Sequence, residues 1–134
     1  GSAQMSHDIR HPFTAGERVL MIRRALSDAE IPLYIIPLED IKRNALWVSH
    51  VRSMVPPFDV VYTSNPLVIR LFEEAGIHVE SPPMYQRKSL SGTSIRQKML
   101  EGDDWKQYVP KAAADVIESV GGVKRLYDIA KTDE

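Results

Sequence analysis

The sequence predicts an α/β fold in which a mainly parallel sheet carries helices on both faces. Short apolar runs alternate with longer stretches of helical periodicity, and proline or glycine separates many of them. That alternation is typical of βα units, whose strands pair in parallel. The chain has 134 residues, which suits one domain with one core, so we expect a single domain over residues 1–134.

The first half of the chain is predicted to begin with a loop and a capped helix. Thr14 and Glu17 have the spacing of a capping box, in which the threonine caps the helix and the glutamate follows three residues later. Short apolar runs bounded by proline are typical of buried strands. In order we expect a loop over residues 1–13, a helix to about Ala29, a buried strand at 33–36, a helix over 44–54 and a buried strand at 60–62.

The second half is predicted to be richer in helix. Pro66 suits the first position of a helix, and Gly76 suits its end. In order we expect a helix from Pro66, a strand at 77–79, a polar loop from Met84 to Gly92 containing Arg87 and Lys88, a helix from Thr93 to Gly102, and two C-terminal helices at 110–120 and 123–131.

Composition excludes several classes of protein. Lys and Arg number 17 against 18 Asp and Glu, so no global positive charge favours nucleic acid as a partner. Cysteine is absent, which excludes disulfides, thiolate metal sites and a cysteine nucleophile. No apolar run approaches the roughly 18 residues that a membrane span needs. We expect a cytoplasmic protein that binds neither nucleic acid nor membrane.

Ligands of parallel sheets bind beyond the carboxyl ends of the strands, and one residue cluster at such a place suits phosphate. Residues 91–96, Ser-Gly-Thr-Ser-Ile-Arg, place small hydroxyl residues, a glycine and Arg96 at a helix start. Free backbone N–H groups and a guanidinium there make a good polyphosphate site, although the alternative is a serine cap with a solvent arginine. Arg10, just before the first helix, is equally compatible with anion binding and with an exposed loop position.

A second cluster suits a flat ring that carries an amide. Asn44 can donate to and accept from a carboxamide, and Trp47, three residues on, offers a stacking surface on the same helix face. The alternative, which the pattern alone favours, is a core tryptophan with a capping asparagine. Other chemistry has little support, because the four histidines show no metal-ligand pattern with carboxylates and no G-x-S-x-G sequence occurs.

Together these segments, in this order, resemble the archaeal-type nicotinamide-nucleotide adenylyltransferases. The resemblance rests on residues 1–4, 9–17, 44–47 and 91–96, with further matches at 37–40, 56–59 and 64–68, so it runs through almost the whole chain. It implies a Rossmann-like nucleotidyltransferase fold that ends in C-terminal helices. The implied reaction joins ATP and nicotinamide mononucleotide (NMN) to give NAD and pyrophosphate, with Mg²⁺ accompanying ATP.

The resemblance also implies roles for individual residues. The family's S-x-T-x-x-R motif is met by Ser91, Thr93 and Arg96, which, with Gly92, would hold the ATP phosphates. Arg10 would reach substrate phosphate and act with Arg96 in catalysis, and Asn65 would contact the ATP ribose. On the NMN side the residues are Ser2, Arg10, Asp40, Asn44 and Trp47. No metal-binding residue is implied, and the family tends to form homo-oligomers.

One departure from the family pattern concerns its H-x-G-H signature, which does not occur in these residues. Residues 1–4 match the end of the family's second strand. We therefore expect an N-terminal segment of the same protein to complete the fold, and the 134-residue chain alone to be inactive. The alternatives are an adenylyltransferase for nicotinic acid mononucleotide or phosphopantetheine, and an inactive nucleotide-binding fragment.

Overall fold

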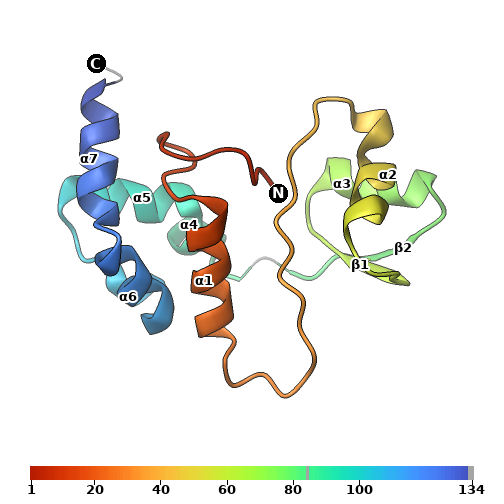
Figure 1. Ribbon diagram of the computed structural model, residues 1–134, viewed down its shortest axis with the longest axis horizontal. Helices are drawn as coiled ribbons and strands as arrows, with labels where there is room; N and C mark the ends of the chain where they lie inside the picture. Colours follow the sequence, from red (N-terminus) through yellow and green to blue (C-terminus); the bar gives the residue numbers. More distant parts are fainter. Residues whose placement is uncertain (84, 133–134) are drawn as a thin grey trace.

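The computed structural model describes residues 1–83 and 85–132 and divides into two regions (Figure 1). A helical region contains α1 (Ala15–Ala25), α4 (Arg87–Leu90), α5 (Gly92–Glu101), α6 (Lys111–Ser119) and α7 (Gly122–Thr132), with a 3-10 turn at Lys106–Tyr108. An α/β region contains the 3-10 turn Asn44–Leu46, α2 (Trp47–Met54), β1 (Val60–Tyr62), α3 (Pro66–Glu74) and β2 (His78–Glu80). Residues 26–43 and 81–86 connect the two.

The helical region holds the main core. Helix α1 packs on α6, and α7 packs on both α5 and α6. Five buried residues form one cluster between them: Met99, Trp105, Ala114, Ile117 and Leu126. Leu126 and Val116 are fully buried, so α6 and α7 provide the platform on which the other helices lie.

Helix α1 begins where its sequence predicts. Thr14 Oγ1 accepts from the Glu17 amide at 3.1 Å, and Glu17 Oε1 accepts from the Thr14 amide at 2.8 Å. Both bonds satisfy amides that a helix start leaves without partners, so the capping box is confirmed.

The α/β region is built on one parallel strand pair. Val60, Val61 and Tyr62 of β1 pair with His78, Val79 and Glu80 of β2. Helix α3 connects the two strands and begins with Asn65 as its cap and Pro66 in its first turn. This βαβ unit confirms the predicted α/β class with parallel strands.

Several predicted elements differ from the structure. Residues 33–36 form no strand, because no neighbouring strand pairs with them among the described residues. Strand β1 is only partly covered, with Tyr62 72% exposed, so its predicted burial is wrong. Helix α1 ends at Ala25, short of Ala29. Residues 87–90 form α4 where a polar loop was expected, while Met84, the first residue of that loop, lies outside the described residues.

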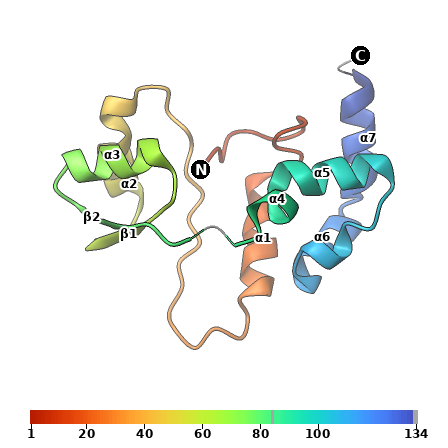
Figure 2. The same cartoon turned by 180° about the vertical axis from the view of Figure 1, so that it is seen from behind.

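The N-terminal segment lies between the two regions (Figures 1 and 2). The Ala3 amide donates to the Leu38 carbonyl at 2.9 Å, so residues 1–4 run beside the end of the 26–43 connection. Within the described residues, no helix is long and apolar enough to cross a membrane.

Candidate functional site

An open cleft of about 540 Å³ joins the loop before α1 to the start of α5. Its lining includes Arg10 and His11 from the loop, and Thr93, Arg96 and Gln97 from α5. Residues far apart in sequence therefore bring two guanidinium groups to one cavity, as the phosphate-site prediction requires.

Helix α5 begins at Gly92 with Ser91 as its cap, whose hydroxyl oxygen accepts from the Ser94 amide at 3.2 Å. The Arg96 side chain folds back over this helix start and donates to Thr93 Oγ1 at 3.4 Å. A Cβ atom at Gly92 would lie 2.7 Å from Arg96 Nη1. The glycine therefore leaves room for the guanidinium beside the free N–H groups of the first turn.

The charge balance of this cleft is unusual. Burial lowers the pKa of Arg96 from its ordinary value, and the positive charge of Arg10 lowers it further, while the negative charge of Asp8 partly opposes both effects. Among residues 1–83 and 85–132, neither arginine forms an ion pair with a carboxylate. Two adjacent cations at a helix N-terminus favour an anionic ligand, since each repels the other in its absence.

The Arg10 turn is closed by Asp8. Asp8 Oδ1 accepts from the His11 amide at 2.7 Å and lies 3.1 Å from His11 Nδ1. The same residues also exchange backbone hydrogen bonds at 3.2 and 3.3 Å. Arg10 is thus presented from the tip of a tight four-residue turn.

Ser2 and Asp40 meet at the second part of the site. The Ser2 hydroxyl donates to Asp40 Oδ2, and the Gln4 side chain bonds both backbone groups of Asp40, at 2.9 and 3.0 Å. Ser2 has a positive φ of 57°, a conformation that few non-glycine residues adopt. Arg18 of α1 stabilises it by donating to the carbonyls of Gly1, Ser2 and Met5 at 3.0 to 3.2 Å.

Trp47 lies at the start of α2. Its ring centroid is 5.5 Å from that of His50, and His50 Nε2 lies 2.9 Å from the carbonyl oxygen of Glu39. Asn44 is exposed at the start of the 3-10 turn and does not cap it, since the cap position is Arg43. The alternative of a core tryptophan with a capping asparagine therefore fails. Trp47 is half-buried rather than buried, and Asn44 is the first residue of the 3-10 turn rather than its cap.

Asn65 is exposed at the start of α3, and its Oδ1 accepts from the amides of Leu67 and Val68. Those contacts fully explain a capping role. No hydrogen bond or ion pair between described residues joins Asn65 to the Arg10–Arg96 cleft or to Asp40. Its predicted contact with a ribose stays a prediction.

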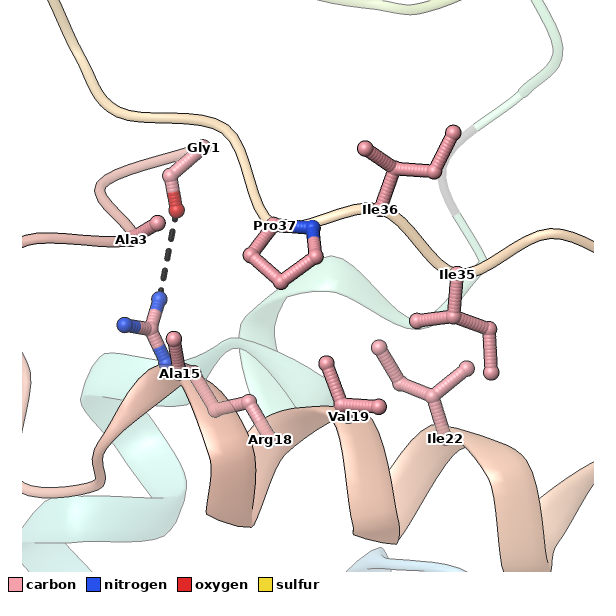
Figure 3. Close-up of a pocket in the computed structure, with 9 residues that line it drawn as sticks. All are labelled: Gly1, Ala3, Ala15, Arg18, Val19, Ile22, Ile35, Ile36 and Pro37. Carbon is pink, nitrogen blue, oxygen red and sulfur yellow. Dashed lines mark hydrogen bonds between the residues drawn. The ribbon is translucent and has the colours of Figure 1, made fainter. Parts of the chain in front are cut away.

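A separate apolar cleft of about 260 Å³ lies between α1, the N-terminal segment and residues 35–37 (Figure 3). Val19 and Ile22 line one side, and the Ile35 side chain faces them from the other, while the Ile36 side chain points away from α1. Its one charged lining residue is Arg18, whose donors are directed to backbone carbonyls. The lining suits hydrocarbon rather than phosphate.

Sequence reasoning missed Arg18 and His50. A clue existed for His50, which follows Trp47 by three residues and so shares its helix face. None existed for Arg18, because its three carbonyl partners belong to a segment without regular structure.

This chain is similar to known proteins over nearly its whole length. Residues 1–98 match the family described as cytidylyltransferase-like. The chain is 67% identical to a nicotinamide-nucleotide adenylyltransferase of Methanocorpusculum labreanum over 133 residues, which cover 99% of this chain and 79% of that protein. Enzymes of the same name from Methanolobus tindarius and Archaeoglobus fulgidus are 62% and 60% identical, covering 100% and 99% of this chain and 78% and 80% of those proteins.

Proposed function

Because this chain belongs to the cytidylyltransferase-like family, among the archaeal nicotinamide-nucleotide adenylyltransferases, we propose that it joins ATP and NMN to form NAD and pyrophosphate. An oxygen of the NMN phosphate attacks the α-phosphorus of ATP. The bond from that phosphorus to the β-phosphate oxygen breaks, and pyrophosphate leaves. The observation that carries this proposal is the convergence of Arg10 and Arg96 on one cleft at the start of α5.

On the ATP side, Arg96 and the start of α5 neutralise the leaving pyrophosphate. Ser91 ends the preceding segment as the helix cap, Gly92 leaves space for the guanidinium, and Thr93 offers a hydroxyl beside it. The attacking phosphate is already ionised near neutral pH, so no strong general base is needed. Alignment and positive charge are therefore the main catalytic contributions of these residues.

On the NMN side, the Ser2–Asp40 contact and the α2 start form one wall. Trp47 stacks on the nicotinamide ring and Asn44 bonds its carboxamide, while Arg10 reaches the NMN phosphate. The link from His50 to the Glu39 carbonyl supports this arrangement, because it ties α2 to the residue before Asp40. Asn65 is assigned to the ATP ribose.

Mg²⁺ is proposed to arrive with ATP. Among the described residues, no group of three histidine, aspartate or glutamate side chains could hold a metal ion. A cation that comes with ATP can keep much of its water, as Mg²⁺ commonly does, so it needs few protein ligands. The ion would supply further positive charge to the phosphates when bound.

The apolar cleft supports an additional packing element from the same protein. Its isoleucine and valine side chains are partly exposed, and residues 33–36 lack a strand partner among the described residues. The relatives are longer than the matched region, which covers 75–80% of them. We assign this cleft to an N-terminal segment that completes the sheet.

A coupled assay of NAD formation tests the proposal. The full-length protein is expected to use NMN with ATP and Mg²⁺, and to use nicotinic acid mononucleotide less well and phosphopantetheine not at all. The isolated 134-residue chain is expected to be inactive until the complementary segment is added. A full-length protein that prefers phosphopantetheine, or makes no dinucleotide, would contradict the assignment. Homo-oligomeric assembly and a cytoplasmic location stay predictions.

A further inference from the structure

A half-buried ion pair joins α7 to α1, the helix that follows the loop carrying Arg10. Arg125 Nη1 donates to Glu17 Oε1 at 2.7 Å, and Nη2 donates to Oε2 at 2.9 Å. The two side chains are only 19% and 17% exposed. A bidentate guanidinium–carboxylate pair fixes orientation as well as distance, so it sets how α1 and α7 lie against each other.

The two side chains of the pair also bond to the backbone of Pro12 and Thr14, which lie between Arg10 and α1. Arg125 Nη1 also donates to the Pro12 carbonyl at 3.0 Å, while Glu17 Oε1 accepts from the Thr14 amide at 2.8 Å. Between them, Phe13 packs on the first residue of α7, where a Cβ at Gly122 would lie 2.7 Å from its ring. Pro12 and Phe13 therefore contact α7 directly, and Thr14 is linked to it through Glu17, the partner of Arg125.

The opposite wall of the phosphate cleft depends on the same helix. Arg96 lies on α5, which packs against α7. Helix α7 thus supports both arginines, one through α5 and the other through residues 12–14. Neither Arg125 nor Glu17 lines the cleft itself.

We propose that Arg125, through its bonds to Glu17 and Pro12, is a positioning residue that sets the separation of Arg10 and Arg96 for polyphosphate binding. This inference rests on the proposed function, because it assigns that site its polyphosphate ligand. Removal of the pair would leave both arginines present but would release the loop from its support. A small misplacement of groups that act together is enough to weaken their joint binding of one ligand.

The test measures inorganic tripolyphosphate binding by calorimetry alongside NAD formation, in the full-length protein. Arg125→Ala is expected to weaken tripolyphosphate binding and to lower kcat/KM on the order of tenfold or more. Lys124→Ala is the matched control, because Lys124 is adjacent on α7 and pairs at the surface with Asp128 of the same helix. It is expected to change neither quantity.

A double-mutant cycle separates positioning from simple stability. In an Arg10→Ala background, Arg125→Ala should weaken tripolyphosphate binding no further, while its lowering of Tm should persist. Additive losses of affinity, or a fall in Tm with unchanged affinity, would overturn the inference. If Arg125→Ala does not fold, Arg125→Lys serves instead, since lysine keeps the charge but cannot reproduce the two-pronged contact.

The two readouts also keep this inference apart from the proposed function. A wild-type protein that binds tripolyphosphate but forms no NAD would contradict the proposed function only. Tripolyphosphate affinity would then still decide the role of Arg125. A wild-type protein without measurable tripolyphosphate affinity would overturn the positioning role even if NAD is formed.

Discussion

The helical and α/β regions each carry part of the candidate site, but they support it differently. Behind the phosphate cleft lies the cluster of five buried residues from α5 to α7. In the α/β region, Phe72 and Ile77 are the buried residues among those described, while Leu46 and Leu67 are 44% and 49% exposed. The cleft proposed for phosphate is thus supported by a buried core, whereas the region proposed to bind the nicotinamide ring has fewer buried residues among those described.

The largest expected effect is on stability. Leu126→Ala in α7 should lower the free energy of unfolding by about 2–5 kcal/mol, because it empties a fully buried position. Leu67→Ala in α3 should change it by about 0.5 kcal/mol, as an exposed position does. Urea unfolding of the two variants measures the difference, and equal losses would remove the contrast between the regions.

Arg96→Ala should reduce the rate of NAD formation on the order of a hundredfold in the full-length protein, since one charge-assisted contact to the reacting phosphates is lost. Arg70→Ala is the control from the other region, where Arg70 is exposed and pairs with Glu74. Steady-state kinetics with ATP and NMN measures both. Unchanged ATP affinity and rate in Arg96→Ala would refute the phosphate assignment.

Acid pH should selectively destabilise the helical region. The hydrogen bonds from Arg125, supported by the Thr14 amide, lower the pKa of Glu17 from 4.5 to about 2. This stabilisation is fully present above pH 4.5 and is lost as the pH falls towards 2. The loss amounts to about 2–3 kcal/mol.

Urea unfolding between pH 5 and pH 2 checks that expectation. This range brackets the pKa of Glu17 in the unfolded chain, 4.5, and in the folded protein, about 2. The wild-type protein should lose more stability over this interval than Glu17→Gln, whose side chain does not titrate. Parallel losses in the two proteins would show that Glu17 is not the group responsible.

The smallest effect concerns the α/β region. NMN should quench or shift the fluorescence of Trp47, and Trp47→Phe should weaken NMN binding about threefold to tenfold. Trp105 is buried in the helical core, so it contributes a constant background. Titration of both proteins with NMN is decisive: the same signal change and affinity would remove Trp47 from the ring-binding site.

Local sequence patterns predicted best the helix starts, which are stabilised by contacts between residues close in the sequence. The Thr14–Glu17 capping box, the Pro66 start of α3 and the Ser91 cap of α5 all depend on residues three or fewer positions apart. The expected strand at 33–36 failed because a strand requires a partner, and an apolar run cannot specify one. The roles of individual site residues followed from the family resemblance rather than from spacing.

The long-range contacts that hold the two parts of the candidate site could not be read from such patterns. Arg18, Arg125 and His50 all bond to backbone carbonyls in segments without regular structure. Every residue has a backbone carbonyl, so the sequence does not indicate which carbonyl accepts a hydrogen bond from a given side chain. The roles of these three residues could be identified only from the folded structure.

The pairing of Glu17 with Arg125 also has a consequence for the order of biosynthesis. The partners are 108 residues apart in the chain. A ribosome therefore produces α1 and the Arg10 loop long before the residue that fastens them. Until α7 has left the exit tunnel, the nascent chain carries the Arg10 loop without its anchor, so the cleft proposed to bind phosphate can form only after α7 has been made.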